Sequence, residues 1–294
     1  MTGPGGRLAA YGVLLVAVLG GGAALGAGVG PIDVGAGSNG GDHDVGHGDP
    51  GNEPAPPGEP AALPAGGLLV SQDGYTMRMA TRVLDPGRPQ PFSFLIEGPD
   101  GSPVHDYDLR HERELHLVVV SADLARFAHV HPSRDALGVW TTELPAVPPG
   151  SYRAFADFDP RAGHPLTLGV DVTVPGPAGA PVELVERREV EVDGYRATLS
   201  GELTPGASSE MGITVRRGGN VITTDPYLGA AGHLVVIRDG DLAYLHVHPV
   251  DGVPPGPVRF GVEVPSIGSY ALFFDFSLQG AVRTASFVTT AGGR

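Results

Sequence analysis

HLVVVSADLARFAHVHP, residues 116–132, and HLVVIRDGDLAYLHVHP, residues 233–249, are two copies of one pattern in this chain of 294 residues. Each copy has a histidine, an apolar run, an Asp-containing turn, a second apolar run and then His-Val-His-Pro. Two short apolar runs separated by a turn are typical of a β-hairpin. The pattern therefore predicts one hairpin in each half of the chain, and each hairpin carries three histidines.

The rest of the chain repeats with nearly the same spacing. The tripeptide GSY at 150–152 recurs at 268–270, and DGY at 73–75 recurs at 193–195. Repetition on this scale predicts two tandem domains of ordinary size. We place the two domains at residues 66–176 and 182–291.

Short apolar segments with turn residues between them fill each repeat, and none has a helical period. Seven such segments in the first repeat predict an all-β fold, with an immunoglobulin-like β-sandwich in each repeat. Tyr152 and Tyr270 follow Pro/Gly or Ser/Gly corners, so we expect them to be tyrosine-corner residues. A barrel of eight strands in each repeat is the alternative architecture.

The register of the hairpins decides where the histidines lie. A two-residue turn centred on Asp239-Gly240 pairs His233 with His246, and one centred on Ala122-Asp123 pairs His116 with His129. Directly opposed residues have Cβ atoms about 4.5–5.5 Å apart. The last histidine of each motif lies two residues further along the strand, so it shares the same face. The expected clusters are His116, His129 and His131 in the first repeat, and His233, His246 and His248 in the second.

Three converging imidazoles in each repeat predict a metal site, because histidine is the commonest side-chain metal ligand. The alternative is that these histidines cap strand ends or donate to nearby carbonyl groups. The chain has no cysteine, which excludes thiolate zinc sites and blue copper. Imidazole ligands suit Cu(II) or Zn(II), and copper binds most tightly of the divalent series. The sequence has no HExxH or Ser-His-Asp arrangement, so we expect a binding protein and not an enzyme.

A later strand of each repeat carries a carboxylate at the same position. Tyr270, Phe274 and Phe276 share the core face of their strand, and Asp275 lies on the opposite face. Asp157 has the same place in the first repeat. We expect both aspartates on a solvated outward face, and the alternatives are a fourth metal ligand or a carboxylate that accepts a hydrogen bond from a ligating imidazole.

Three further histidines are possible accessory ligands. His111 lies five residues before His116, so it faces away in an unbroken strand, although a bulge would recruit it. His43 and His47 lie among aspartates in DHDVGHGD, a composition that can capture metal weakly. An ordinary polar linker is the alternative explanation for these two residues.

The N-terminal part predicts export. Residues 8–30 contain no charged residue, and about 20 apolar residues are enough to span a bilayer. Arg7 favours a single-pass membrane anchor with the N-terminus inside. A cleaved signal peptide and secretion are the alternative. We therefore expect a signal or anchor helix at 1–30, a disordered Gly/Pro/Asp-rich linker at 31–65 and an extracytoplasmic location.

The net charge of −14 argues against a nucleic-acid partner. The partners that the sequence predicts are a metal ion and, through the N-terminal helix, a membrane; it does not identify a protein partner.

The two motifs, each followed by AFADF or LFFDF, resemble exported bacterial β-sandwich proteins with HLxxx…HxHP repeats, generally labelled hypothetical or heavy-metal-associated. The similarity covers both repeats and the N-terminal segment. It implies an exported sandwich, and copper storage or resistance follows by fold-level analogy. The alternative function is a non-enzymatic adhesion or scaffold module of the cell envelope, in which the histidines are structural.

Overall fold

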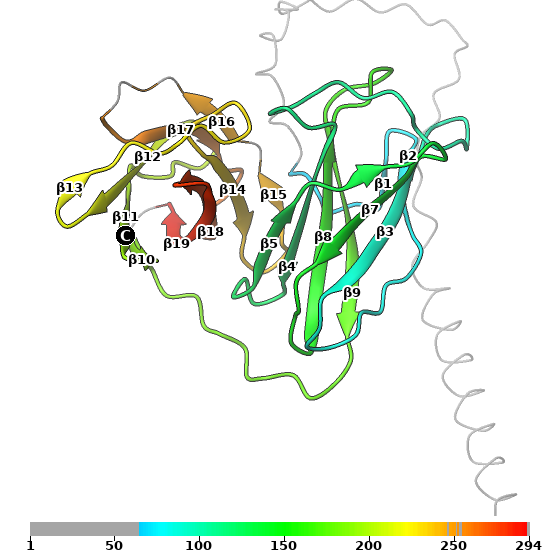
Figure 1. Ribbon diagram of the computed structural model, residues 1–294, viewed down its shortest axis with the longest axis horizontal. Coiled ribbons are helices and arrows are strands. Elements are labelled where there is room, and N and C mark those ends of the chain that lie inside the picture. Colours follow the sequence, from blue (N-terminus) through cyan, green and yellow to red (C-terminus); the bar gives the residue numbers. More distant parts are fainter. Residues whose placement is uncertain (1–64, 246, 251, 253–254, 293–294) are drawn as a thin grey trace, which may run out of the picture. The chain divides into compact units, whose positions relative to one another are not determined.

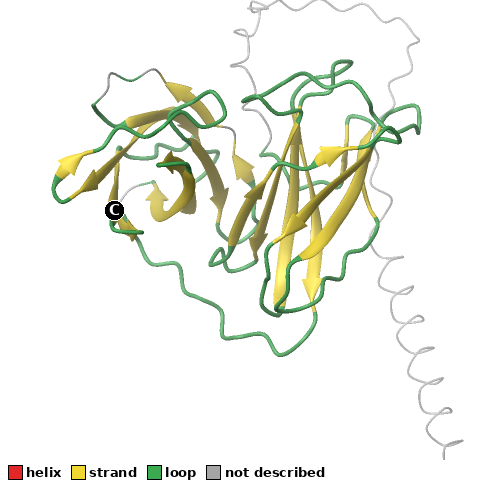
Figure 2. Ribbon diagram, in the orientation of Figure 1, coloured by secondary structure: helices red, strands yellow, loops and turns green. Residues whose placement is uncertain are grey.

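The computed structural model describes residues 65–245, 247–250, 252 and 255–292 (Figure 1). These residues form strands, turns and loops, and no α-helix occurs among them (Figure 2). No helix within this part of the chain is therefore long and apolar enough to cross a membrane. The predicted anchor at 1–30 and the linker histidines His43 and His47 lie outside the described residues.

The first domain is a sandwich of two antiparallel sheets (Figure 1). One sheet has the order β1-β2-β3-β7-β6, and the other has the order β5-β4-β8-β9. The strands of the first sheet are β1 (Ser71–Gln72), β2 (Tyr75–Met79), β3 (Gln90–Glu97), β7 (Val139–Leu144) and β6 (Ser133–Arg134). Those of the second are β5 (Phe127–Val130), β4 (Leu115–Ser121), β8 (Gly150–Phe158) and β9 (Leu166–Val174).

The second domain repeats this arrangement. Its sheets have the orders β10-β11-β12-β17-β16, with β13 paired to β12, and β15-β14-β18-β19. The strands of the first of these sheets are β10 (Glu189–Val192), β11 (Tyr195–Ser200), β12 (Ser208–Arg217), β13 (Asn220–Val221), β17 (Val258–Glu263) and β16 (Val247–Val250). Those of the second are β15 (Tyr244–Leu245), β14 (His233–Arg238), β18 (Gly268–Leu278) and β19 (Ala281–Ala291). The predicted tandem β-sandwich fold is confirmed.

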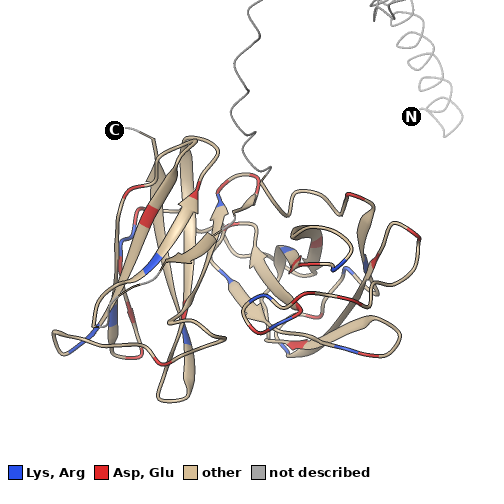
Figure 3. Ribbon diagram, turned by 90° about the horizontal axis from the view of Figure 1, so that it is seen from above, with Lys and Arg blue, Asp and Glu red and all other residues tan. Residues whose placement is uncertain are grey.

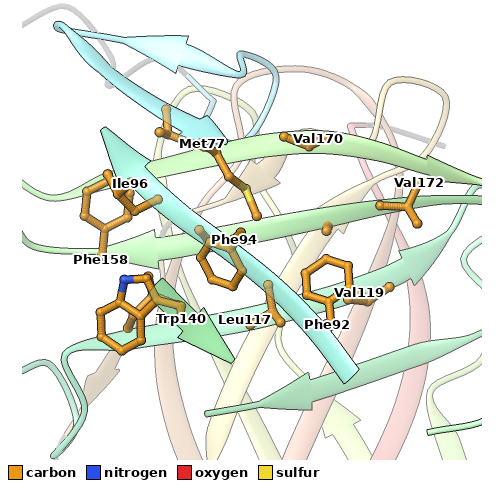
Figure 4. Packing of buried hydrophobic residues seen from close by; sticks show 14 of the residues in the cluster. Met77, Phe92, Phe94, Ile96, Leu117, Val119, Trp140, Phe158, Val170 and Val172 are labelled. Atoms are coloured by element: carbon orange, nitrogen blue, oxygen red, sulfur yellow. The ribbon is translucent and has the colours of Figure 1, made fainter. Parts of the chain in front are cut away.

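Alternating burial along the strands builds each core. In β3, Phe92, Phe94 and Ile96 are almost fully buried and alternate with partly exposed residues, as the period of two requires. Figure 4 shows these side chains, from a strand of one sheet, facing Leu117 and Val119 from a strand of the other. Charged residues lie both in loops and on strands of the two domains (Figure 3). The core-facing parity predicted for β18 is confirmed in the second domain, where Tyr270, Phe274 and Phe276 belong to the core cluster.

Both predicted tyrosine corners are present. The Tyr152 hydroxyl donates a hydrogen bond to the Pro148 carbonyl oxygen at 2.8 Å, and the Tyr270 hydroxyl donates to that of Ser266 at 2.7 Å. Each bond closes the turn that leads into β8 or β18. This feature of immunoglobulin-like sandwiches therefore occurs at the same place in both domains.

A third apolar cluster joins the two domains, whose described residues fall in one compact unit. It consists of outward-facing residues of the β4/β8 sheet and of the β14/β18 sheet. Phe127 and Phe273 stack across this junction, with ring centroids 4.1 Å apart and planes 7° from parallel. Strand β4 is consequently buried on both faces, and its burial is continuous from Leu115 to Ser121. The cluster comprises Val118, Val120, Leu124, Phe155, Val235, Ile237, Ala271 and Phe273, with Phe127, Leu184, Leu242 and Tyr244 against it.

The segment that enters the first domain also crosses this junction. Gly66 exchanges two backbone hydrogen bonds with Tyr244, of 2.9 and 3.0 Å, and Gly67 donates one to the Thr167 carbonyl oxygen. A Cβ atom at Gly169 would lie 1.9 Å from the carbonyl oxygen of Gly67, so only glycine allows this close approach. The entering segment is thus bonded to β15 of one domain and to β9 of the other.

Candidate metal centre

The first hairpin has a longer loop than the sequence predicts. Val118 pairs with His129, and Leu117 pairs with Val130, so the register differs by two residues from the expected pairing of His116 with His129. The cause is a four-residue loop at 122–125, closed by a bond from the Ser121 amide to the Arg126 carbonyl oxygen. A shift of two residues leaves every side chain on its original face. The predicted triplet therefore still shares one face.

His116, His129 and His131 form the group of metal-type ligands found among the described residues. His116 Nδ1 lies 3.1 Å from Nε2 of His129 and 3.1 Å from Nε2 of His131. The three ring centroids are 4.8–5.3 Å apart. We call these three residues the histidine triad.

Hydrogen bonds on the far side of two rings fix their tautomers. His116 Nε2–H donates to the Arg110 carbonyl oxygen at 3.0 Å, because a carbonyl only accepts. His129 Nδ1–H donates to the Asp275 carboxylate at 2.8 Å. The remaining nitrogens, His116 Nδ1 and His129 Nε2, thus turn lone pairs toward each other. A single proton can form a hydrogen bond between only two of the three rings. A metal ion, in contrast, can be bound by a nitrogen from each of the three rings.

The spacing of these nitrogens suits one ion. Imidazole nitrogens bind zinc at about 2.0–2.1 Å, so two nitrogens 3.1 Å apart subtend roughly 100° at the ion. That angle is close to the tetrahedral value. Three histidines on one side of an ion leave one coordination position for water or another ligand.

The acceptor behind His129 comes from the other domain. Asp275, on β18, is only 3% exposed, and its second oxygen accepts a hydrogen bond from the Thr284 hydroxyl. The expectation of a solvated outward face is therefore wrong for Asp275: the sheet face that carries it is covered by the first domain. A carboxylate behind a ligating imidazole orients the ring and raises its basicity.

Asp157, the counterpart of Asp275, has a different role. It accepts a hydrogen bond from the Thr167 hydroxyl at 3.1 Å and lies 3.6 Å from the Arg110 guanidinium. Burial raises the pKa of its carboxyl group. It contacts Thr167 and Arg110, and no hydrogen bond joins it to the triad among the described residues.

Two further imidazoles lie beside the triad. His233, on β14, has its ring centroid 6.3 Å from that of His116 and 6.5 Å from that of His129. His111 lies 4.9 Å from His233 and reaches the cluster through a turn, closed between Arg110 and Arg113, and not through the bulge that we considered. Its φ of 48° places its backbone in the left-handed region. The rings of His233 and His111 lie beside the triad, but they are too far away to bind the same ion as the triad in this arrangement.

The second triplet is not gathered as the hairpin count predicts. Val236 pairs with Leu245 and not with Ala243, which is again a shift of two residues. His248 lies on β16, where it pairs with Gly261 of the other sheet. His246 lies outside the described residues. The physical reason is that the strand switches sheets before His248 in the second repeat, whereas β6 begins only after His131 in the first.

The environment lowers the pKa of four histidines at this site. Burial, and next the neighbouring His129, lower the pKa of His116 to about 2 and that of His131 to about 3. Burial likewise lowers the pKa of His233 to about 4 and lowers that of His111. Neutral imidazole is the form that ligates metals. The ligand nitrogens of His116 and His131 are therefore available at neutral pH.

Depressed histidine pKa values predict loss of stability in acid. Below about pH 6.5 the unfolded chain takes up protons that the folded chain does not, so the free energy of unfolding falls with pH. We expect a loss of up to about 1.4 kcal/mol per pH unit for each such histidine, and less for the partly exposed His131. Urea unfolding at pH 7, 6 and 5 in chelator measures this slope. His116→Gln should reduce it, the exposed control His164→Gln should not, and equal stability at pH 7 and 5 would contradict the prediction.

The sequence does not reveal the groups behind the rings. His116 and His233 donate from Nε2 to carbonyl oxygens six residues upstream, those of Arg110 and Tyr227. Every residue has a backbone carbonyl, so the residue type at positions 110 and 227 does not show that its carbonyl accepts a hydrogen bond. The continuous apolar runs of β4 and β18 could have indicated an outer face covered by another domain, because strands buried on both faces lose their alternation.

A family model described as Domain of unknown function (DUF8832) matches residues 70–176 and, a second time, residues 190–293. None of the curated proteins matches the chain.

Several solved structures align with both domains. The FdeC adhesin of Escherichia coli has 13% identity and a TM-score of 0.24, over 76% of this chain and 65% of that chain. Salmonella alpha-2-macroglobulin has 15% identity and a TM-score of 0.27, over 77% and 16%. The Yersinia pseudotuberculosis adhesin InvE has 11% identity and a TM-score of 0.22, over 75% and 59%. This chain spans less than two thirds of the length of each of the three.

Proposed function

We propose that this chain, which belongs to the DUF8832 family and carries two copies of its domain, binds one divalent transition-metal ion through His116, His129 and His131. The observation that carries the proposal is the convergence of three imidazoles, in which His116 Nδ1 lies 3.1 Å from a ring nitrogen of each of the other two and the far nitrogens of two rings are already engaged. A proton shared between His116 Nδ1 and one partner does not bridge to the third ring nitrogen, whereas one cation is bound by all three.

Cu(II) or Zn(II) is the proposed ion, because neutral imidazoles without thiolates suit these metals. The histidine-bound carboxylate of Asp275 supports the same choice, since metal-ligating histidines almost always have such a partner. The site belongs to the first domain, and its supporting acceptor belongs to the second. The second domain is therefore proposed as a support for the site and not as the carrier of an equal one.

The proposed role is storage, carriage or sensing of metal outside the cytoplasm, without catalysis. The uncharged segment at residues 8–30 supports export, either with a retained anchor or with a cleaved signal. His116 is only 5% exposed, and Asp275 supports the site from the domain junction. This burial favours retention of an ion over rapid exchange.

Titration calorimetry with ZnCl₂ and CuSO₄ on the full chain, purified without a histidine tag, tests this function. We expect one tight site per chain. Asp275→Asn should weaken binding about 10–100-fold, the usual effect of losing an outer-sphere carboxylate. Asp157→Asn is the matched control, because Asp157 has the same strand position but bonds to Thr167; it should leave the affinity nearly unchanged.

Circular dichroism confirms that each variant is folded. If the folded parent binds neither metal at micromolar concentration, the proposal is overturned, and the histidines are structural parts of a scaffold module. Two equal tight sites would instead support the expectation of one site per repeat.

A further inference from the structure

A second and larger cavity lies at the domain junction, beside the metal centre. Its volume is about 610 Å³, within the range of about 300–1,000 Å³ that is usual for small-molecule sites. Residues of β9 and its preceding loop line it on one side, and residues of β15 and the end of β17 line it on the other. Ligand sites occur preferentially at such domain interfaces.

The Arg110 side chain on the wall of this cavity lacks a hydrogen-bond acceptor. Among the described residues its polar partner is Asp157 at 3.6 Å, which is longer than a hydrogen bond. The side chain is only 21% exposed, and its guanidinium offers five N–H donors in a fixed fork. Asp157 is an ion-pair partner but accepts no hydrogen bond from this guanidinium, so its donors remain available to a ligand in the cavity. Its fork fits a carboxylate in a bidentate manner.

Tyr244 supplies a second free donor on the same wall. Its ring packs 5.4 Å from that of Phe155, and its backbone pairs with Gly66. No hydrogen bond to its hydroxyl is formed by any residue in the described part of the chain. Tyr244 and Arg110 both line the 610 Å³ cavity and the small cavity of about 50 Å³ beside His116.

The remaining walls are mostly apolar, with Pro165, Leu166, Leu245, Val264 and Pro265 among them. Glu263 also lines the cavity and disfavours a second negative charge on a ligand. We propose that this cavity binds an amphipathic monocarboxylate, with the carboxylate on Arg110 and Tyr244 and the apolar body against the leucine and proline walls. The chain carries a net charge of −14 and therefore repels anions in general. We accordingly expect a carboxylate to bind at this cavity and not elsewhere on the surface.

This site is separable from the metal centre. The Arg110 carbonyl, and not its side chain, accepts the hydrogen bond from His116. Replacing the side chain therefore leaves that acceptor in place. Failure of the carboxylate site and failure of the metal site can be observed independently.

The test uses the full chain and two probes, the fluorescent anion 8-anilinonaphthalene-1-sulfonate and octanoate as its competitor. We expect saturable binding of one probe per chain, displacement by octanoate, and no displacement by uncharged octanamide at the same concentration. Arg110→Met should weaken octanoate binding at least tenfold. The matched control is Arg161→Gln, an exposed arginine paired with Asp108, which should leave octanoate binding unchanged.

Tyr244→Phe provides a second variant that removes only the hydroxyl, and we expect several-fold weaker octanoate binding. Circular dichroism and urea midpoints equal to those of the parent show that each variant is folded. The proposal is overturned if octanamide competes as well as octanoate, or if folded Arg110→Met binds octanoate like the parent. Failure of the full chain to bind either probe, because another segment fills the cavity, overturns it as well.

Discussion

Replacing His116 with alanine is expected to abolish tight metal binding. His116 is the central ligand, because its Nδ1 lies 3.1 Å from the ligand nitrogens of both His129 and His131. Its loss leaves two imidazoles, and we expect affinity to fall by more than about 100-fold, beyond the 10–100-fold effect of losing an outer partner. Titration calorimetry of Zn(II) into the full-length variant measures the change.

The matched control is His164→Ala, in the same domain. His164 is exposed and pairs with Asp73, so its removal should leave affinity and stoichiometry unchanged. His129→Ala repeats the test at a second ligand in case His116→Ala loses its fold. A folded His116→Ala protein that binds one Zn(II) with parental affinity would show that the triad is not the site.

Replacing Phe273 with alanine is expected to destabilise the domain junction strongly. Phe273 is 2% exposed and stacks on Phe127 of the other domain at 4.1 Å. Truncation of a buried phenylalanine costs about 3–5 kcal/mol. Because Asp275 lies two residues further along the same strand, we also expect weaker metal binding when the junction loosens.

The single tryptophan makes this prediction measurable. Trp140 lies in the core of the first domain, so its fluorescence reports unfolding of that domain, whereas circular dichroism reports both. In the parent the two urea transitions should coincide, and in Phe273→Ala they should separate. Ile267→Ala, at a side chain 74% exposed, is the control and should change little. Coincident and unshifted transitions in Phe273→Ala would contradict a coupled junction.

Local patterns predicted much of the fold because they act over a few residues. The GSY corners, the alternation of apolar residues and the turn-separated runs predicted tandem sandwiches, and both Tyr152 and Tyr270 make their corner hydrogen bonds. The common face of His116, His129 and His131 was predicted correctly although the register was wrong by two residues. The face on which a side chain lies changes only when the strand register shifts by an odd number of residues, so a shift of two leaves it unchanged.

The second triplet shows where local reasoning ends. The two motifs are alike in sequence, yet β15 ends at Leu245 and β16 pairs with β17, which takes His248 into the other sheet. Which sheet a strand joins depends on competing partners far along the chain. No count within residues 233–249 contains that information.

The sequence by itself determined the all-β class, the two-domain repeat and the face on which the first triad lies, because these follow from periodicity and from short-range turns. Only the tertiary structure decided that the outer sheets of the two domains pack together, with Val118 and Phe155 against Val235 and Phe273. That packing buries Asp275 behind His129 and brings His233 beside the triad. The physical reason is that burial of an outer apolar face requires a partner surface, and the residues of one domain do not specify which surface covers them.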